Sequence, residues 1–404
     1  MQSVSISRLF VLVVLAVGAA TSAVAQDPAP STRETAIEQD QAEKVKALHP
    51  YVPGKGEALF NRAEDILVNG VPSWHPFFTS AYYGGGFTLG AGYAHHVSPY
   101  NMIDVRGSYT ILGYKLLEAE LTAPRLFHRR GSLSVIGGWR EVTQAAFYGK
   151  GMSTSLDDRT DFAFQQPFGS GTLTFWPTRR LWMLRGGLEL SRYSQQAGEG
   201  SFPSVDKVYT PATLPGIGTK TTYVHSQGTF GFDWRTSPGY SRRGGFYGVT
   251  VHDFTDPDEK FGFRRLDYEL IQHIPIFREA WVISLRGEVQ TTYTKNNQQI
   301  PFFLLPYVGS GSTMRGFMSH RFRDQNRIVG QVEWRIMANR FMDTAVFYDA
   351  GKVTARRADL DFSGLKSDYG FGVRFHGPFA TPLRVEVARS PEGTRLVVAV
   401  QPIF

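Results

Sequence analysis

The chain has 404 residues and no cysteine, which excludes a disulfide framework and thiolate chemistry. Aromatic residues make up 14% and charged residues 20%, and no internal run approaches about 18 apolar residues, so a helical membrane protein is also excluded. The net charge of +7 comes from scattered Lys and Arg that form no helical stripe. Nucleic acid is therefore not expected as a partner, whereas outer-membrane lipid and lipopolysaccharide are.

Residues 1–25 are predicted to be a signal peptide. Arg8 gives a positive start, residues 9–17 form an apolar core, and Ala23-Val24-Ala25 is an A-x-A cleavage site. The apolar core is too short to span a membrane. The mature chain is therefore expected to leave the cytoplasm.

Residues 26–72 differ from the rest of the chain. The stretch 32–48 is rich in Glu, Gln, Lys and Ala, which favours a short helix, and 57–68 carries apolar residues at helical spacing. The interpretation is a periplasmic leader with a short amphipathic helix. The alternative is a helix that plugs or caps a pore.

Residues 73–404 show a period of two, as strands do. In 103–111 apolar residues such as Tyr109 alternate with polar ones such as Asp104, and 281–293 alternates likewise. A soluble sandwich also alternates, but its strands are usually shorter. Charges on one face and aromatics on the other, in an exported chain, favour a transmembrane β-barrel with a polar lumen.

The lengths of the connections set the topology. Short and long connections alternate, as they do in barrels with short periplasmic turns and longer outer loops. The run Phe302-Phe303-Leu304-Leu305 resembles a strand, but counting it as one would break this alternation. It is therefore assigned to a long, lumen-directed outer loop, 294–325.

The sequence thus predicts an all-β fold, an antiparallel transmembrane barrel of about 16 strands. The strands are expected to begin near residues 74, 87, 102, 115, 132, 161, 181, 223, 244, 262, 280, 327, 341, 368, 383 and 395. The last strand ends on Phe404, a C-terminal aromatic that is typical of exported barrel proteins. The alternative is an ordinary closing strand that ends on Phe.

Within the loop, residues 309–317 read Gly-Ser-Gly-Ser-Thr-Met-Arg-Gly-Phe. A guanidinium taken out of bulk water must be paired and hydrogen-bonded. Glu333 and Asp349 are the nearest candidates to pair with Arg315, because both fall on the polar faces of the next two strands. The hypothesis is a loop lock in the lumen; the alternative is that each charge is solvated there.

Two neighbours on the same faces support the lock hypothesis. Gln331 shares the polar face with Glu333. Phe347 shares a face with Asp349, where its ring can stack on the guanidinium.

No catalytic or metal motif stands out. G-x-S-x-G, H-E-x-x-H and phosphate-loop spacings do not occur. Ser310 and Ser312 have no obvious base, and adjacent His95 and His96 would point to opposite faces of a strand. No enzyme activity, metal or cofactor is expected.

Met314-Arg315-Gly316-Phe317 resembles the V-R-G-F/Y loop motif of the bacterial surface-antigen family. This family's barrel is shared by BamA- and TamA-like outer-membrane assembly factors and two-partner secretion transporters. Gln331-Val332-Glu333 and the run 347–351 resemble its two barrel-wall motifs, which hold the loop arginine. The resemblance covers roughly 73–404 and implies the following lock residues: Arg315, Gly316, Phe317, Glu333 and Asp349, supported by Gln331, Phe347 and Gly351.

The resemblance implies a role in inserting polypeptides into the bacterial outer membrane or translocating them across it. Members that do this carry POTRA domains, and residues 26–72 are too short and too helical in pattern for one. A POTRA-less member is therefore expected, with a client polypeptide or a separate periplasmic partner. The alternative is a passive channel or structural barrel without assembly activity.

Overall fold

The computed structural model describes residues 33–47, 73–178, 181–295, 297–377 and 380–400. The predicted signal peptide, the predicted helix in 57–68 and Phe404 lie outside these residues. Helix α1 (Arg33–Ala47) falls within the Glu-, Gln-, Lys- and Ala-rich stretch. Among the described residues, no helix is both long and apolar enough to cross a membrane.

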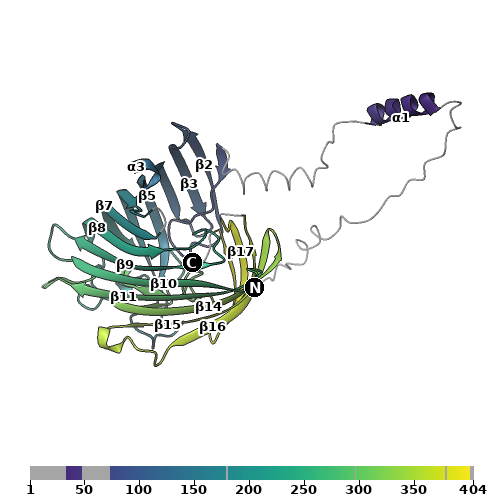
Figure 1. Ribbon diagram of the computed structural model, residues 1–404. Helices are drawn as coiled ribbons and strands as arrows, with labels where there is room; N and C mark the ends of the chain where they lie inside the picture. The colour runs from purple at the N-terminus through teal and green to yellow at the C-terminus, as the bar shows by residue number, and fades with distance from the viewer. Residues whose placement is uncertain (1–32, 48–72, 179–180, 296, 378–379, 401–404) are drawn as a thin grey trace. The chain divides into compact units, whose positions relative to one another are not determined.

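Sixteen strands form one antiparallel sheet in which neighbours in sequence are neighbours in space (Figure 1). They are β1 (Trp74–Pro76), β2 (Thr88–His96), β3 (Met102–Thr110), β4 (Lys115–Arg125), β5 (Gly131–Phe147), β6 (Thr160–Phe175), β7 (Trp182–Ala197), β8 (Lys220–Asp233), β9 (Gly244–Thr255), β10 (Phe263–Phe277), β11 (Trp281–Thr294), β14 (Asn326–Asn339), β15 (Met342–Thr354), β16 (Lys366–Phe375), β17 (Leu383–Ser390) and β18 (Gly393–Ala399). The predicted all-β barrel architecture is confirmed. The largest error in a strand start is at β8, which begins at Lys220 rather than near 223.

The two faces of the sheet differ as the alternation predicts. In β3, Tyr109 is 58% exposed whereas Asp104 is 6% exposed. In β14, Val332 and Trp334 are exposed while Glu333 between them is buried. The apolar side chains therefore point outward, and the polar ones line the interior.

Long and short connections alternate around the sheet. The short end includes α3 (Leu126–Arg129) between β4 and β5. The long connections contain α4 (Val205–Val208), η1 (Phe302–Leu304), β12 (Tyr307–Val308), β13 (Phe322–Arg323) and η2 (Arg357–Asp359). The run 302–305 lies outside the wall, as predicted. Strands β12 and β13 pair with each other inside the loop, which the sequence did not reveal because each has only two residues.

An apolar cluster fills the interior at the long-loop end of the sheet. Phe302 lies at its centre, with ring centroids 4.8 Å from Phe162 and 5.3 Å from Phe147. Leu214, from the connection between β7 and β8, is buried in the same cluster. The backbone N–H of Phe302 donates to the Pro215 carbonyl at 3.0 Å. Two long loops thus share one apolar core inside the wall.

At the short-turn end, the connection between β8 and β9 folds inward. Its Tyr240 donates to Asp343 Oδ2 at 2.8 Å and stacks on His376 with ring centroids 3.8 Å apart. Arg335 Nη2 donates to the Ser241 carbonyl at 2.5 Å. Strands β10, β11 and β14 lie between β9 and β15 in the sheet. The turn therefore reaches past β10 and β11 to bind residues of β14, β15 and the segment directly after β16.

Candidate functional site: the Arg315 cluster in the lumen

The tip of the loop, residues 309–317, is folded by its own hydrogen bonds. Gly309 N–H donates to Thr313 Oγ1 at 3.1 Å, and Ser310 N–H donates to the Met314 carbonyl at 3.2 Å. Gly309 has a φ of +97°, and a Cβ there would lie 2.3 Å from the Met318 carbonyl oxygen. Only glycine fits this turn. The tip is therefore compact enough to present one side chain in a fixed direction.

That side chain is Arg315, which is 0% exposed. Its Nε and Nη2 both donate to Asp349, to Oδ2 and Oδ1 respectively, each at 2.7 Å. Its Nη1 donates to Glu333 Oε2 at 3.1 Å and to Glu386 Oε1 at 3.0 Å. The bidentate pair with Asp349 has the planar geometry that arginine favours and lysine cannot reproduce. Three carboxylates from three wall strands, β14, β15 and β17, thus surround one loop cation.

The Phe347 ring completes the site. The guanidinium carbon of Arg315 lies 3.3 Å from the ring centroid, so cation–π attraction adds to the ion pairs. Burial by itself would lower the pKa of Arg315, but the three carboxylates outweigh it and hold that pKa above the value of free arginine. The loop arginine is therefore charged at every physiological pH.

We call Arg315, Phe347, Glu333, Asp349, Glu386 and Arg374 the Arg315 cluster. Arg374 pairs with Glu333 and, at 3.0 Å, with Glu386. Glu386 Oε2 also accepts from Arg384 at 2.6 Å. Glu333 and Glu386 each have a second arginine partner. Among the described residues, Asp349 has no second arginine at a comparable distance, so it depends most on Arg315.

The wall also holds the backbone of the tip. Four backbone carbonyls of the tip each accept a hydrogen bond from a wall side chain. The pairs are Gly311 with Arg384 (3.0 Å), Ser312 with Arg286 (3.1 Å), Thr313 with Gln331 (2.7 Å) and Gly316 with Ser390 (2.8 Å). Carbonyls taken out of water need such donors. The docked position is therefore specified by backbone contacts as well as by charge.

Small residues make room for this approach. A Cβ on Gly316 would lie 2.6 Å from the Cβ of Asp368, and one on Gly351 would lie 2.8 Å from the Ile328 carbonyl oxygen. Phe317 is buried in a separate apolar cluster with Val308, Met314, Phe322, Val329 and Val353. The predicted residues Gly316, Phe317 and Gly351 thus serve close packing rather than charge pairing.

A second loop arginine contacts other parts of the chain. Arg321 Nε donates to the two carboxylate oxygens of Glu392 at 2.9 and 3.0 Å. Its Nη2 donates to the Thr154 carbonyl at 2.6 Å. Glu392 lies in the turn between β17 and β18, and Thr154 lies in the connection between β5 and β6. The loop therefore links the last hairpin to a connection far from it in sequence.

His320 lies beside Arg321 and is 1% exposed. Its ring stacks on Tyr82, with centroids 4.4 Å apart, and lies 4.1 Å from the Tyr307 centroid. Burial and the nearby Arg323 hold the pKa of His320 well below its usual value. The docked loop therefore carries a neutral histidine.

The structure brings the five predicted residues Arg315, Glu333, Asp349, Gln331 and Phe347 together. Sequence reasoning missed Glu386 and Arg374, which lie 71 and 59 residues beyond Arg315. The polar-face alternation of β16 and β17 was the available signal. Among the described residues, no group of three or more His, Asp or Glu side chains is placed to hold a metal ion. The arrangement binds a loop and offers no evident reacting group.

A sheet with apolar side chains outward, polar ones inward and a long loop folded into the lumen defines the class of β-barrel proteins that span the outer membrane. The Omp85 superfamily domain matches residues 101–394, so the chain belongs to the Omp85 superfamily. The predicted family is thus confirmed. Comparison with curated protein sequences gives no match.

Two solved structures have a similar fold. The first is BamA from Haemophilus ducreyi lacking POTRA domains 1-3, with a TM-score of 0.59 and 14% identity over 82% of this chain and 70% of that chain. The second is CdiB from Escherichia coli, with a TM-score of 0.53 and 11% identity over 81% of this chain. This chain spans 59% of the CdiB chain. At these identities the likeness concerns the fold.

Proposed function

We propose that this barrel assists the insertion or translocation of polypeptides at the outer membrane, and that the Arg315 cluster is a releasable lock on the loop. The observation that carries the proposal is the complete burial of one loop cation among three wall carboxylates. Such a network specifies one docked geometry, but it is no stronger than apolar packing of similar volume. This combination suits a loop that must hold one position and also leave it.

The edges of the sheet support a role with extended polypeptides. β1 pairs with β2 through three residues, Trp74 to Pro76, whereas β2 pairs with β3 through nine. A short edge strand is easily displaced, and an open edge offers N–H and C=O groups to an incoming strand. We infer that a client pairs with this edge of the sheet while the loop is displaced from the lumen.

The proposed role is non-enzymatic. Its partners are a client polypeptide and a separate periplasmic partner that delivers it. The predicted leader, residues 26–72, lies on the periplasmic side in this proposal, and the long loops face the exterior.

The test is deletion of the gene, followed by quantification of all outer-membrane β-barrel and secreted proteins. Depletion of a subset, restored by the wild-type chain but not by Arg315→Ala, is the expected result. Arg356→Ala is the matched control, because Arg356 is an arginine on another outer loop whose side chain is 78% exposed. An unchanged outer-membrane and secreted proteome refutes the proposal.

Planar-bilayer recording separates the proposal from a passive channel. The apolar cluster around Phe302 and the docked loop favour a closed barrel. We expect low conductance from the wild-type chain and larger, fluctuating conductance from Arg315→Ala. Large, steady conductance that is the same in both proteins favours the channel.

A further inference from the structure

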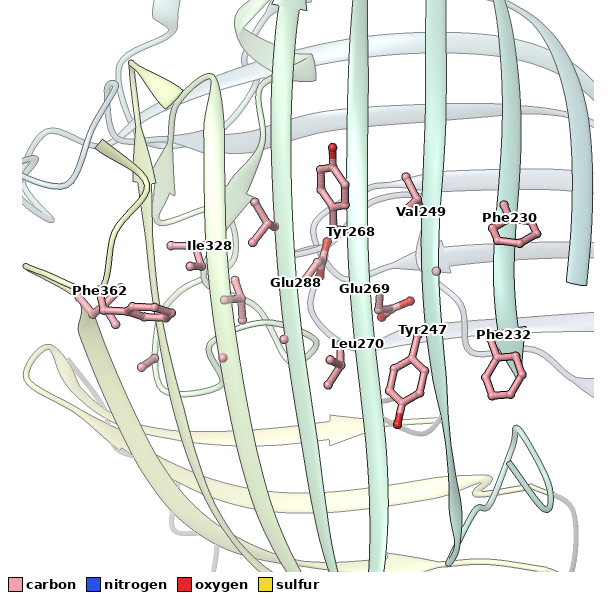
Figure 2. Close-up of a pocket in the computed structure, with 17 residues that line it drawn as sticks. Phe230, Phe232, Tyr247, Val249, Tyr268, Glu269, Leu270, Glu288, Ile328 and Phe362 are labelled. Atoms are coloured by element: carbon pink, nitrogen blue, oxygen red, sulfur yellow. The ribbon is translucent and has the colours of Figure 1, made fainter. Parts of the chain in front are cut away.

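A groove of about 700 Å³ lies on the outward, lipid-facing side of the wall, apart from the Arg315 cluster (Figure 2). Its floor consists of Gly287 on β11, Gly330 on β14 and Ala350 on β15. These residues are direct neighbours in the sheet, because Gly287 pairs with Gly330 and Gly330 pairs with Ala350. A Cβ on either glycine would meet no heavy atom within 4 Å. The floor is therefore a strip of nearly bare backbone that only an outside molecule can cover.

Large side chains border this floor on both sides. Leu270 on β10 pairs with Gly287, and Tyr268 stands two residues further along the same strand, both exposed. On the other side lie Phe362 and Leu365 from the connection between β15 and β16. Phe362 is 83% exposed, and Figure 2 shows it at the edge of the groove. An exposed phenylalanine beside an apolar groove is expected to pack against an apolar partner.

The groove itself contains no free charge. Glu269 and Glu288 border the groove, but they alternate with the outward Tyr268, Leu270 and Gly287, so their side chains belong to the inward face. Both carboxylates are bound by Arg286, at 2.8 and 2.9 Å. Glu288 also pairs with Arg327. The floor and walls therefore suit a hydrocarbon chain.

Positive charge gathers at the outer end of the same strands. Tyr293 on β11 is paired with Arg264 on β10, and the guanidinium of Arg357 lies 4.1 Å from the Tyr293 ring centroid. Lys295 and Arg264 share one carboxylate, Asp253, at 3.1 and 3.3 Å. Two of these cations share the Asp253 carboxylate, and Arg357 lies over the neighbouring tyrosine ring. Among the described ion pairs, Asp253 neutralises one of the three positive charges, which leaves two for a phosphate to neutralise.

The spacing of the two features fits within one membrane leaflet. Tyr293 is four residues beyond Val289, which lines the groove. At about 3.4 Å per residue the separation is roughly 14 Å. Because barrel strands tilt by about 35–45°, this corresponds to roughly 10–11 Å along the membrane normal, which fits within one leaflet of the ~30 Å hydrocarbon core. A headgroup at the cations would therefore place its acyl chain along the groove.

We propose that this groove binds an acyl chain of a phosphorylated, multiply acylated glycolipid of the outer leaflet, with a phosphate between Arg264 and Arg357. Charge complementarity at the outer end selects an anionic lipid, and the glycine floor selects an ordered chain. The site is a lipid-binding site independent of the loop lock. It fixes the lipid next to strands β10, β11, β14 and β15, and not at the edges of the sheet.

The test is titration of the purified full chain, in mild detergent, with bisphosphorylated hexa-acyl lipid A, read by native mass spectrometry. Gly330→Leu adds a side chain to the floor at a position where its Cβ meets no heavy atom within 4 Å. Gly169→Leu is the matched control, because Gly169 lies on the outward face of β6, has nothing within 4 Å of its Cβ position and does not line the groove. We expect Gly330→Leu to weaken lipid A binding at least about tenfold and Gly169→Leu to leave it unchanged.

Two further measurements keep the proposal testable if Gly330→Leu folds poorly. Phe362→Ser alters only a loop residue and is expected to weaken lipid A binding as well. Arg264→Ala combined with Arg357→Ala is expected to remove the preference for lipid A over its dephosphorylated form. Equal binding of lipid A by the wild type, Gly330→Leu and Phe362→Ser overturns the proposal. Equal binding of phosphatidylethanolamine, or a polypeptide in the groove that lipid A does not displace, also overturns it.

Discussion

Removing the loop cation is the sharpest perturbation of the lumen. In Arg315→Ala, Glu333 and Glu386 keep Arg374 as a partner, whereas Asp349 loses both of its 2.7 Å contacts. It keeps two weaker donors, Gln331 Nε2 and the backbone N–H of residue 315, each at 3.3 Å. One uncompensated buried charge costs about 3–5 kcal/mol. The docked loop should therefore lose roughly two to three and a half orders of magnitude in its equilibrium against the released loop.

The measurement is amide hydrogen exchange over residues 309–323, with the full chain in lipid nanodiscs. Exchange of protected amides reports the free energy of local opening, so the rates should rise by the same factor. Arg356→Ala, which breaks an exposed 2.9 Å pair with Asp359, should change exchange less than about fivefold. The comparison separates loss of the buried cluster from loss of any arginine.

A double variant tests the assigned cause. If the cost comes from a stranded Asp349 carboxylate, Asp349→Asn introduced into Arg315→Ala should restore part of the protection, because the orphaned charge is gone. Unchanged exchange in Arg315→Ala refutes the lock. A double variant in which the two losses simply add refutes the explanation through Asp349.

Three further predictions concern the same loop. Gly316→Ala places a Cβ 2.6 Å from the Cβ of Asp368 and should raise the hydrogen-exchange rate of the tip by about tenfold or more. An unaltered rate would show that Asp368 moves aside without loss of docking. Arg321→Ala removes the bonds from the loop to Glu392 in the turn of the last hairpin, so proteinase K should cleave residues 391–392 faster than in wild type; equal cleavage rates would contradict that link. His320 has a depressed pKa when docked, so the released loop binds a proton that the docked loop does not. Docking should therefore weaken as pH falls below about 6.5, by up to about tenfold per unit, and His320→Phe, measured by exchange at pH 7.0 and 5.5, should remove this dependence.

The wall was predictable because alternation acts residue by residue. Lipid outside and polar groups inside impose a period of two on every strand, and a shift of one residue would invert both faces. The same rule placed Glu333 and Asp349 inward. The same alternation also indicates that Glu386 points inward. In β17, Arg384 and Glu386 alternate with the apolar Leu383 and Val385.

The contacts inside the lumen were less predictable, because they join segments far apart in sequence. Arg315 and Glu386 are 71 residues apart, and nothing local shows which inward carboxylates meet the loop. For the connection at Tyr240, the alternation of short and long connections predicts no more than a short turn. Its inward fold depends on Asp343 and His376, more than 100 residues later, so no local pattern could reveal it.

The inward turn at Tyr240 and the apolar cluster around Phe302 lie at opposite ends of the strands. If each opens independently at a cost of about 3 kcal/mol, each is open for less than roughly 1% of the time. Both are then open together only about once in 10⁴ instances or less. With two such closures in series, a molecule can enter from one side without a continuous path forming through the barrel. The outer membrane would thus keep its permeability barrier even while either end of this barrel is occupied.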